Sequence, residues 1–154
     1  MKIVLVPDSF KGSLSSLAVC RVMAEQLAAA LPAATLRQIP VADGGEGSVE
    51  ALLTALGGER VEVTVQGPYG EALTAAYGHL PDGVAIVEMA AAAGLPLVGE
   101  RRRADLTTTY GAGELILHAA RNGARRIIVG LGGSATNDGG CGAAAACGVR
   151  FLRA

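Results

Sequence analysis

The sequence of 154 residues predicts an α/β protein. Candidate strands at residues 3–6, 36–41 and 126–129 each lead into a polar loop that contains glycine, and a helical pattern follows each loop. Strands that alternate with helices favour a parallel sheet. Between residues 61 and 87 the pattern changes to the apolar and polar alternation of antiparallel strands. We therefore expect a parallel sheet together with an antiparallel meander.

The amino-terminal part predicts the order strand, helix, strand, helix. Residues 3–6 form a short apolar run, and apolar side chains at helical spacing then extend from residue 16 to residue 30. Pro32 ends this helix, because proline disfavours helical geometry at the residue before it. A second strand at 36–41 leads to a helix at 49–56.

The middle of the chain predicts a meander of three strands. Apolar residues alternate at 61–65, and strands at 73–80 and 84–87 follow. Gly67-Pro68-Tyr69-Gly70 and Pro81-Asp82-Gly83 are turn sequences that separate these strands. The change of pattern indicates either an inserted subdomain or an extension of the sheet.

Helices are expected again in the last third of the chain. The helix that begins near Thr107-Thr108-Thr109 ends at Gly123, a residue suited to the helix terminus. The remaining expected elements are a short helix of small residues at 90–93, a strand at 126–129, a short helix at 143–147 and a strand that begins at 149–152.

Composition and charge exclude several classes of protein. The formal net charge is −1, so no nucleic-acid footprint is visible, and Arg101-Arg102-Arg103 is expected to be a solvated surface loop. Cys20, Cys141 and Cys147 have no C-x-x-C spacing, which favours reduced thiols in a cytoplasmic protein. The first apolar run is too short for a signal peptide or a membrane span.

The loop after the strand at 126–129 carries the densest chemistry. Glycines allow backbone N–H groups to approach an anion, and a helix that begins just afterwards adds its positive dipole end. Asn137 and Asp138 supply oxygen ligands that suit Mg²⁺, and a carboxylate can instead accept a proton from an attacking hydroxyl. The loop therefore predicts a phosphoryl-transfer site.

Two other interpretations of this loop stay open. Its glycine, serine, asparagine and aspartate residues are also ordinary turn residues. In addition, Gly130-x-Gly132-x-x-Ala135 fits the dinucleotide fingerprint, which predicts an NAD-type oxidoreductase domain. Against the fingerprint, Asp138 falls where the first helical turns should run, and the expected acidic ribose ligand lies at or past the chain end.

Polar residues also follow the two earlier strands. Lys11 can act as a point charge on a phosphate, with Ser9 and Ser13 as hydroxyl partners. Asp43 and Glu46 lie in a glycine-rich turn, where either carboxylate could hold a metal or orient a hydroxyl. Capping of the helix that follows each loop is the structural alternative for these acids and hydroxyls.

These loops together resemble the bacterial type I glycerate kinases. The matching stretches are VPDSFKGS at 6–13, PVADGGEG at 40–47, TTTYGAGEL at 107–115 and GLGGSATNDGG at 130–140. The resemblance implies a Rossmann-like parallel sheet with helices on both faces and an inserted second domain that contains the meander. It also implies Mg·ATP as the donor and D-glycerate as the acceptor, with 2-phosphoglycerate favoured as the product.

The resemblance places a cleft at the matching residues. The predicted catalytic residues are Lys11, Asp43 and Asp138, and the predicted metal ligands are Asp43 and Asp138. The predicted substrate- and phosphate-binding residues are Asp8, Ser9, Gly12, Ser13, Gly44, Gly45, Glu46, Gly132, Gly133, Ser134, Thr136 and Asn137.

The chain corresponds to an amino-terminal portion of this family, whose members are more than twice as long. We place the Rossmann-like part at residues 1–59 and the second α/β segment, with the glycine-rich loop, at 60–154. A small-molecule kinase and a catalytically silent fragment therefore both stay open. Neither a nucleic-acid nor a membrane partner is expected, and association into a homo-oligomer is left open.

Overall fold

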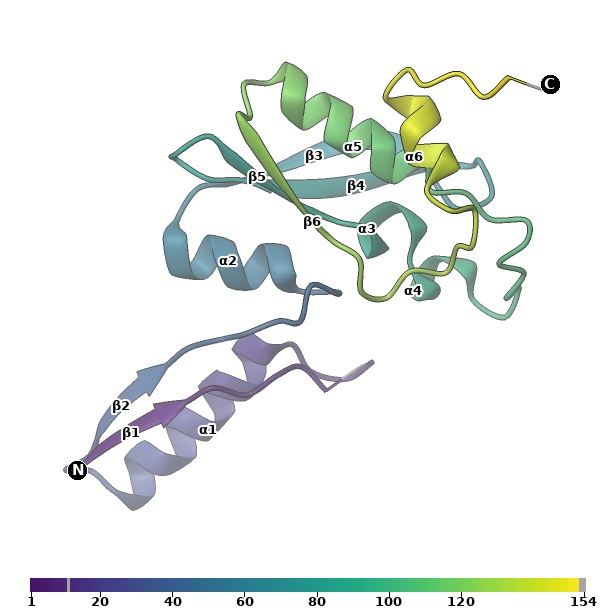
Figure 1. The fold of residues 1–154 in the computed structure, drawn as a ribbon. Helices are drawn as coiled ribbons and strands as arrows, with labels where there is room; N and C mark the ends of the chain where they lie inside the picture. The colour runs from purple at the N-terminus through teal and green to yellow at the C-terminus, as the bar shows by residue number, and fades with distance from the viewer. Residues whose placement is uncertain (11, 153–154) are drawn as a thin grey trace.

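The fold contains two separate β-sheets (Figure 1). It is seen in a computed structural model that describes residues 1–10 and 12–152. A parallel pair joins β1 (Lys2–Leu5) and β2 (Thr35–Gln38). The larger sheet has the order β3 (Glu59–Gln66), β4 (Ala72–His79), β5 (Val84–Glu88) and β6 (Arg126–Gly130). The helices are α1 (Ser16–Ala30), α2 (Ser48–Leu56), α3 (Ala90–Ala93), α4 (Leu95–Val98), α5 (Tyr110–Arg121) and α6 (Cys141–Ala146).

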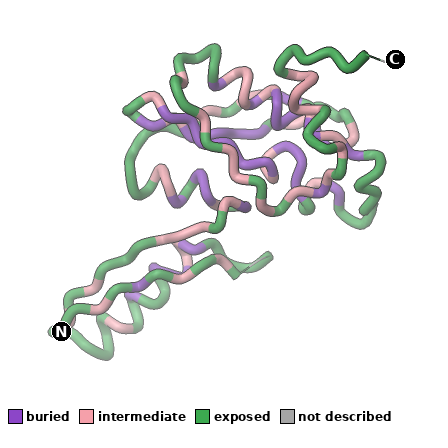
Figure 2. The backbone as a smooth tube through the Cα atoms, in the orientation of Figure 1, coloured by how far each residue is buried: buried purple, intermediate pink, exposed green. Residues whose placement is uncertain are grey.

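The parallel pair is covered by α1 on one face. Ser15 caps this helix by accepting a hydrogen bond from the Ala18 amide at 3.2 Å, and Cys20 of the helix is fully buried. Successive side chains of a strand point to opposite faces. Leu5 is accordingly buried, whereas Val4 is 50% exposed and Val6, just beyond β1, is 52% exposed. Figure 2 shows the contrast between this largely exposed part and the buried four-stranded sheet.

The four-stranded sheet confirms the predicted meander. β3, β4 and β5 pair antiparallel in sequence order, and β6 then returns parallel to β5. The crossover between β5 and β6 contains α5, which lies on one face of the sheet, while α2 lies on the other (Figure 1). The fold is therefore a mixed α/β arrangement with helices on both faces of its larger sheet.

Each face of this sheet has its own apolar core, as the alternation along β5 requires. Ala85 and Val87 join Tyr77 and Leu115 beneath α5. Val84 and Ile86, which alternate with these residues along β5, point to the opposite face. They form a cluster with Leu80 and with Val49 of α2. Because α2 begins directly after the loop at residues 39–47, this second core sets the position of that loop.

Helix α6 crosses α5 at very short range. A Cβ atom at Gly113 would lie 2.6 Å from the Ala143 Cα atom, a separation that real side chains do not adopt. Gly113 therefore allows the two helix backbones to touch. This contact places the start of α6 beside the start of α5.

The carboxyl-terminal residues do not form the predicted strand. The prediction of a strand at 149–152 is wrong: these residues are irregular and exposed, because no neighbouring strand pairs with them among the described residues. The division into two domains between residues 59 and 60 stays a prediction, and α2 packs on the four-stranded sheet rather than on β1 and β2.

Within the described residues, no helix is long and apolar enough to cross a membrane.

Candidate functional site

Three polar loops follow the carboxyl ends of parallel strands, where α/β sheets bind ligands. We call residues 6–15 the first loop, 39–47 the second loop and 131–140 the third loop; they follow β1, β2 and β6. The second and third loops interlock through their backbones. The Gly132 amide donates a hydrogen bond to the Gly44 carbonyl oxygen at 3.1 Å.

Glycine is required at this contact for a steric reason. A Cβ atom at Gly132 would lie 2.7 Å from the Gly45 Cα atom, and one at Gly130 would overlap the Gly44 carbonyl oxygen. Gly45 itself is buried. The glycines predicted to bind phosphate therefore first serve to bring two site loops together.

Ser16 joins the first loop to the second. Its hydroxyl donates to the Pro7 carbonyl oxygen at 2.7 Å and accepts from the Val41 amide at 2.9 Å. The side chain is buried, so the bonds are shielded from water. Ser16 was not among the predicted site residues, because a serine at the first position of a helix usually signals only the helix start.

The first loop keeps several polar groups at the surface. Lys11 lies outside the described residues. The Asp8 carboxylate accepts from the Ser9 amide at 2.7 Å, and the Ser13 hydroxyl donates to the Phe10 carbonyl oxygen at 3.2 Å. Because Ser15 caps α1, neither Asp8 nor Ser13 is needed for that purpose. Gly12 is exposed beside them, with a positive φ.

The second loop leaves one carboxylate oxygen of Asp43 without a partner among the described residues. Its other oxygen accepts from the Gly45 amide at 3.0 Å. Asp43 and Glu46 are both exposed, and neither caps α2, whose N-cap is Gly47. The capping alternative for these two acids is thus not what the structure shows.

Glu88 supplies the cap that α2 lacks. Its carboxylate, at the end of β5, accepts from the Val49 amide at 2.6 Å and is only 8% exposed. Glu88 also pairs with Gly130 in the β5–β6 register. Glu88 is thus a buried acid that ties the helix start after the second loop to the strands from which the third loop emerges.

Burial raises the pKa of Glu88 above its ordinary value, although hydrogen bonds from the Val49, Gly47 and Ser48 amides oppose this change. The negative charge of nearby Glu46 raises the pKa further. Desolvation therefore destabilises the charged carboxylate, and its hydrogen bonds offset this only in part.

Asp138 has a different electrostatic setting in the third loop. Its carboxylate accepts from the amides of Thr109, Gly140 and Gly142 at 2.8, 3.0 and 3.1 Å. Partial burial alone would raise the pKa of Asp138, but these bonds, together with that from the Thr109 hydroxyl, lower it below the ordinary range. Asp138 therefore stays ionised and firmly held.

The rest of the third loop presents hydroxyls and backbone amides. The Ser134 and Thr136 hydroxyls are hydrogen-bonded at 2.8 Å, and Asn137 is exposed. Within residues 1–10 and 12–152, the amides of Gly133, Asn137 and Gly139 have no hydrogen-bond partner. Such free N–H groups are what a bound anion needs.

The loop is braced from outside by α3 and the threonines before α5. The Ala135 amide donates to the Ala93 carbonyl oxygen, and the Thr107 hydroxyl donates to the Ala135 carbonyl oxygen, both at 2.8 Å. The hydroxyls of Thr108 and Thr109 contact Asp138. All three threonine hydroxyls are therefore engaged within the protein.

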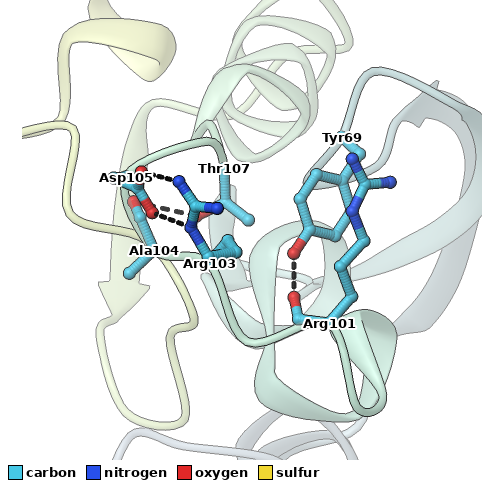
Figure 3. A network of polar contacts seen from close by, with 6 residues as sticks. All are labelled: Tyr69, Arg101, Arg103, Ala104, Asp105 and Thr107. Atoms are coloured by element: carbon cyan, nitrogen blue, oxygen red, sulfur yellow. Dashed lines mark hydrogen bonds and ion pairs between the residues drawn. The ribbon is translucent and has the colours of Figure 1, made fainter.

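The arginine segment before these threonines forms its own surface network (Figure 3). Arg103 makes a two-pronged pair with Asp105 at 2.8 and 2.6 Å. The Arg101 guanidinium lies 4.1 Å from the centre of the Tyr69 ring, whose hydroxyl donates to the Arg101 carbonyl oxygen. This segment is exposed, as the sequence predicted.

The structure contradicts the dinucleotide-fingerprint interpretation. That motif requires a helix directly after the strand. Here β6 ends at Gly130 and α6 begins only at Cys141, while Ala135 is held in an extended segment against Ala93. The physical reason is that Gly130 and Gly132 serve the contact with the second loop rather than a strand-to-helix turn.

Comparison with known proteins supports the resemblance seen in the sequence. The sequence model of the Glycerate kinase family matches residues 3–154. The chain belongs to the glycerate kinase family. Similar members include glycerate kinase from Halalkalibacterium halodurans, 48% identical over 98% of this chain, and glycerate 2-kinase from Escherichia coli, 48% identical over 100% of it.

A solved structure of the family has the same fold. The crystal structure of putative glycerate kinase 2 from Salmonella typhimurium LT2 superposes with a TM-score of 0.79, at 48% identity over 95% of this chain. The chain spans about 40% of the length of these relatives. The predicted family and the predicted partial coverage are thus both confirmed.

Replacement of Gly132 by alanine should loosen the contact between the second and third loops. We expect Gly132→Ala to lower the free energy of unfolding by about 1–3 kcal/mol, because the added methyl group overlaps Gly45. Its neighbour Leu131 is 69% exposed, so Leu131→Ala should change the value by less than about 0.5 kcal/mol. Urea unfolding of both variants measures the difference, and equal effects would contradict the steric role.

Replacement of Glu88 separates its capping role from its charge. Glu88→Ala leaves buried amides unpaired and should cost about 1–3 kcal/mol, whereas Glu88→Gln keeps an acceptor and should cost less. Because the folded-state pKa is raised above 4.5, the wild-type chain should lose stability as pH rises through that pKa. Glu88→Gln should lack this loss.

Urea unfolding at a series of pH values tests this expectation. Glu100→Gln, at an exposed position, serves as the charge-matched control and should retain the wild-type pH profile. A Glu88→Gln profile that matches the wild type would show that this carboxylate does not carry the dependence.

Proposed function

We propose that this chain carries the phosphate-holding part of a kinase that transfers a phosphoryl group from ATP to D-glycerate, with 2-phosphoglycerate as the product. The interlock of the second and third loops, through Gly44 and Gly132, is the observation that carries the proposal. It joins a loop in which one Asp43 oxygen has no partner among the described residues to a loop in which three amides have none, in a chain that belongs to the glycerate kinase family.

Phosphoryl transfer requires mainly positioning and the neutralisation of negative charge. The free amides of Gly133, Asn137 and Gly139 are the groups in this chain that would hold phosphate oxygens. Lys11 would add a positive charge, as predicted from its place in the first loop. The hydroxyls of Ser134 and Thr136 offer further donors.

Asp43 is the residue that best fits a Mg²⁺ ion. Mg²⁺ is commonly held by one or two carboxylates together with substrate phosphates, and it neutralises the charge that develops between them. Asp43 is exposed and retains an oxygen without a partner among the described residues. The described residues contain no group of three or more His, Cys, Asp or Glu side chains that could hold a metal ion.

This function is that of a cytoplasmic protein acting on small molecules. The spacing of Cys20, Cys141 and Cys147, without a C-x-x-C pair, supports this location. Asp8, Ser9, Gly12 and Ser13 of the first loop would contribute to substrate or phosphate binding. Self-association stays an open prediction.

The test is coupled ATP consumption with D-glycerate, run on this chain and on the full-length Bacillus subtilis relative, which is 49% identical over the matched part. Asp43→Asn in each background should lower the rate by about 100-fold or more. Glu50→Gln, an exposed acid on the first turn of α2, is the control and should retain the rate. Turnover by the relative but not by this chain would limit the proposal for this chain to phosphate binding.

A further inference from the structure

Asp138 is the most heavily hydrogen-bonded acid of the third loop. Five donors reach its carboxylate: the amides of Thr109, Gly140 and Gly142, and the hydroxyls of Thr108 and Thr109. An ionised carboxylate offers about four lone-pair sites. Both oxygens of Asp138 are therefore occupied by the protein itself.

These donors belong to the beginnings of two helices. Thr109 is the N-cap of α5 and Gly140 is the N-cap of α6, and neither makes a side-chain cap of its own helix. Asp138 accepts from the first amides of both. The Thr109 hydroxyl in turn accepts from the Ala143 amide of α6 at 2.9 Å. Asp138 and Thr109 thus cap the two helices reciprocally.

The approach is too close for any other residue at the start of α6. A Cβ atom at Gly142 would lie 2.7 Å from the Tyr110 amide nitrogen and 2.8 Å from an Asp138 carboxylate oxygen. The arrangement around Asp138 is therefore built from the backbone of both helices and leaves little room for an additional ligand.

We propose that Asp138 is a positioning residue, which fixes the free amides of the third loop by clamping that loop to α5 and α6, and that it neither ligates Mg²⁺ nor accepts the substrate proton. The proposal rests on the proposed function for the identity of the anion. Asp138 follows directly after Asn137, whose free amide is one of the donors offered to phosphate. Release of the clamp would free the loop between its bond to Ala93 and α6.

The alternative role as a metal ligand has an energetic cost. A carboxylate oxygen that turned toward a metal would give up bonds to the Thr109, Gly140 or Gly142 amides. Hydrogen bonds to charged groups contribute more than neutral ones, and the unpaired amides would add a further penalty. Asp43, whose second oxygen has no partner among the described residues, would break no such bond.

Nucleotide binding with and without metal distinguishes the two roles. The dissociation constant of ATP is measured for the wild-type chain, Asp138→Asn and Asp43→Asn, once with Mg²⁺ and once with EDTA. If Asp138 is a positioning residue, Asp138→Asn should weaken ATP binding about tenfold with Mg²⁺ and by a similar factor with EDTA. Asp43→Asn should weaken it only with Mg²⁺. A loss for Asp138→Asn that is confined to the Mg²⁺ condition would overturn the proposal.

Hydrogen exchange provides a readout that needs no ligand. Asp138→Asn should speed amide exchange at residues 136–142 in the free chain, whereas Asp43→Asn should leave that segment unchanged. Unchanged exchange at 136–142 in Asp138→Asn would overturn the clamp. If the wild-type chain binds no ATP, the proposed function fails for this chain, and exchange still decides the role of Asp138.

A second pair of variants covers the case in which Asp138→Asn does not fold. Thr109→Val removes the hydroxyl that links Asp138 to the Ala143 amide, and Thr109→Ser retains it. Thr109→Val should speed exchange at 136–142, and Thr109→Ser should restore the wild-type rate. Equal rates in these two variants would show that the reciprocal cap does not hold the loop.

Discussion

The contact between the backbones of the second and third loops is the constraint on which the candidate site depends. The two loops follow strands of different sheets, β2 and β6, so neither sheet alone brings them together. The bond from Gly132 to Gly44 does so, and only because no side chain separates the chains at Gly130, Gly132 and Gly45. Glycine at these positions is first a packing requirement. The close approach of the two loops then allows both to face the same ligand.

Two carboxylates hold this arrangement with opposite electrostatic consequences. Glu88 anchors the second loop from a buried strand end, and burial raises its pKa. Asp138 anchors the third loop from a less buried position, where hydrogen bonds prevail and lower its pKa. Both carboxylates accept hydrogen bonds from amides at the starts of helices. Their negative charges are therefore held within the fold rather than in the space open to a ligand. Asp43 differs from both, because one of its carboxylate oxygens has no partner among the described residues.

Local patterns in the sequence predicted the elements better than their contacts. Alternation at 61–65 and the turn at 81–83 identified the meander, and Pro32 and Gly123 marked helix ends that the structure shows at Ala30 and Arg121. Ser16 and Glu88 could not be found in this way, because their roles depend on partners 25 and 39 residues distant. The strand expected at 149–152 failed for the same reason, since an apolar run becomes a strand only where a neighbour pairs with it.

The third loop and the first loop differ in how they are held. The contacts that position the third loop lie within residues 44–142. The first loop is tied to the second by the Ser16 hydroxyl, between Pro7 and Val41, and Val4 on the outward face of β1 is half exposed. Parallel strands are ordinarily covered on both faces. The open face of β1 therefore leaves the first loop with less packing beneath it, whereas the third loop is held by hydrogen bonds with Ala93, Thr107 and Thr109.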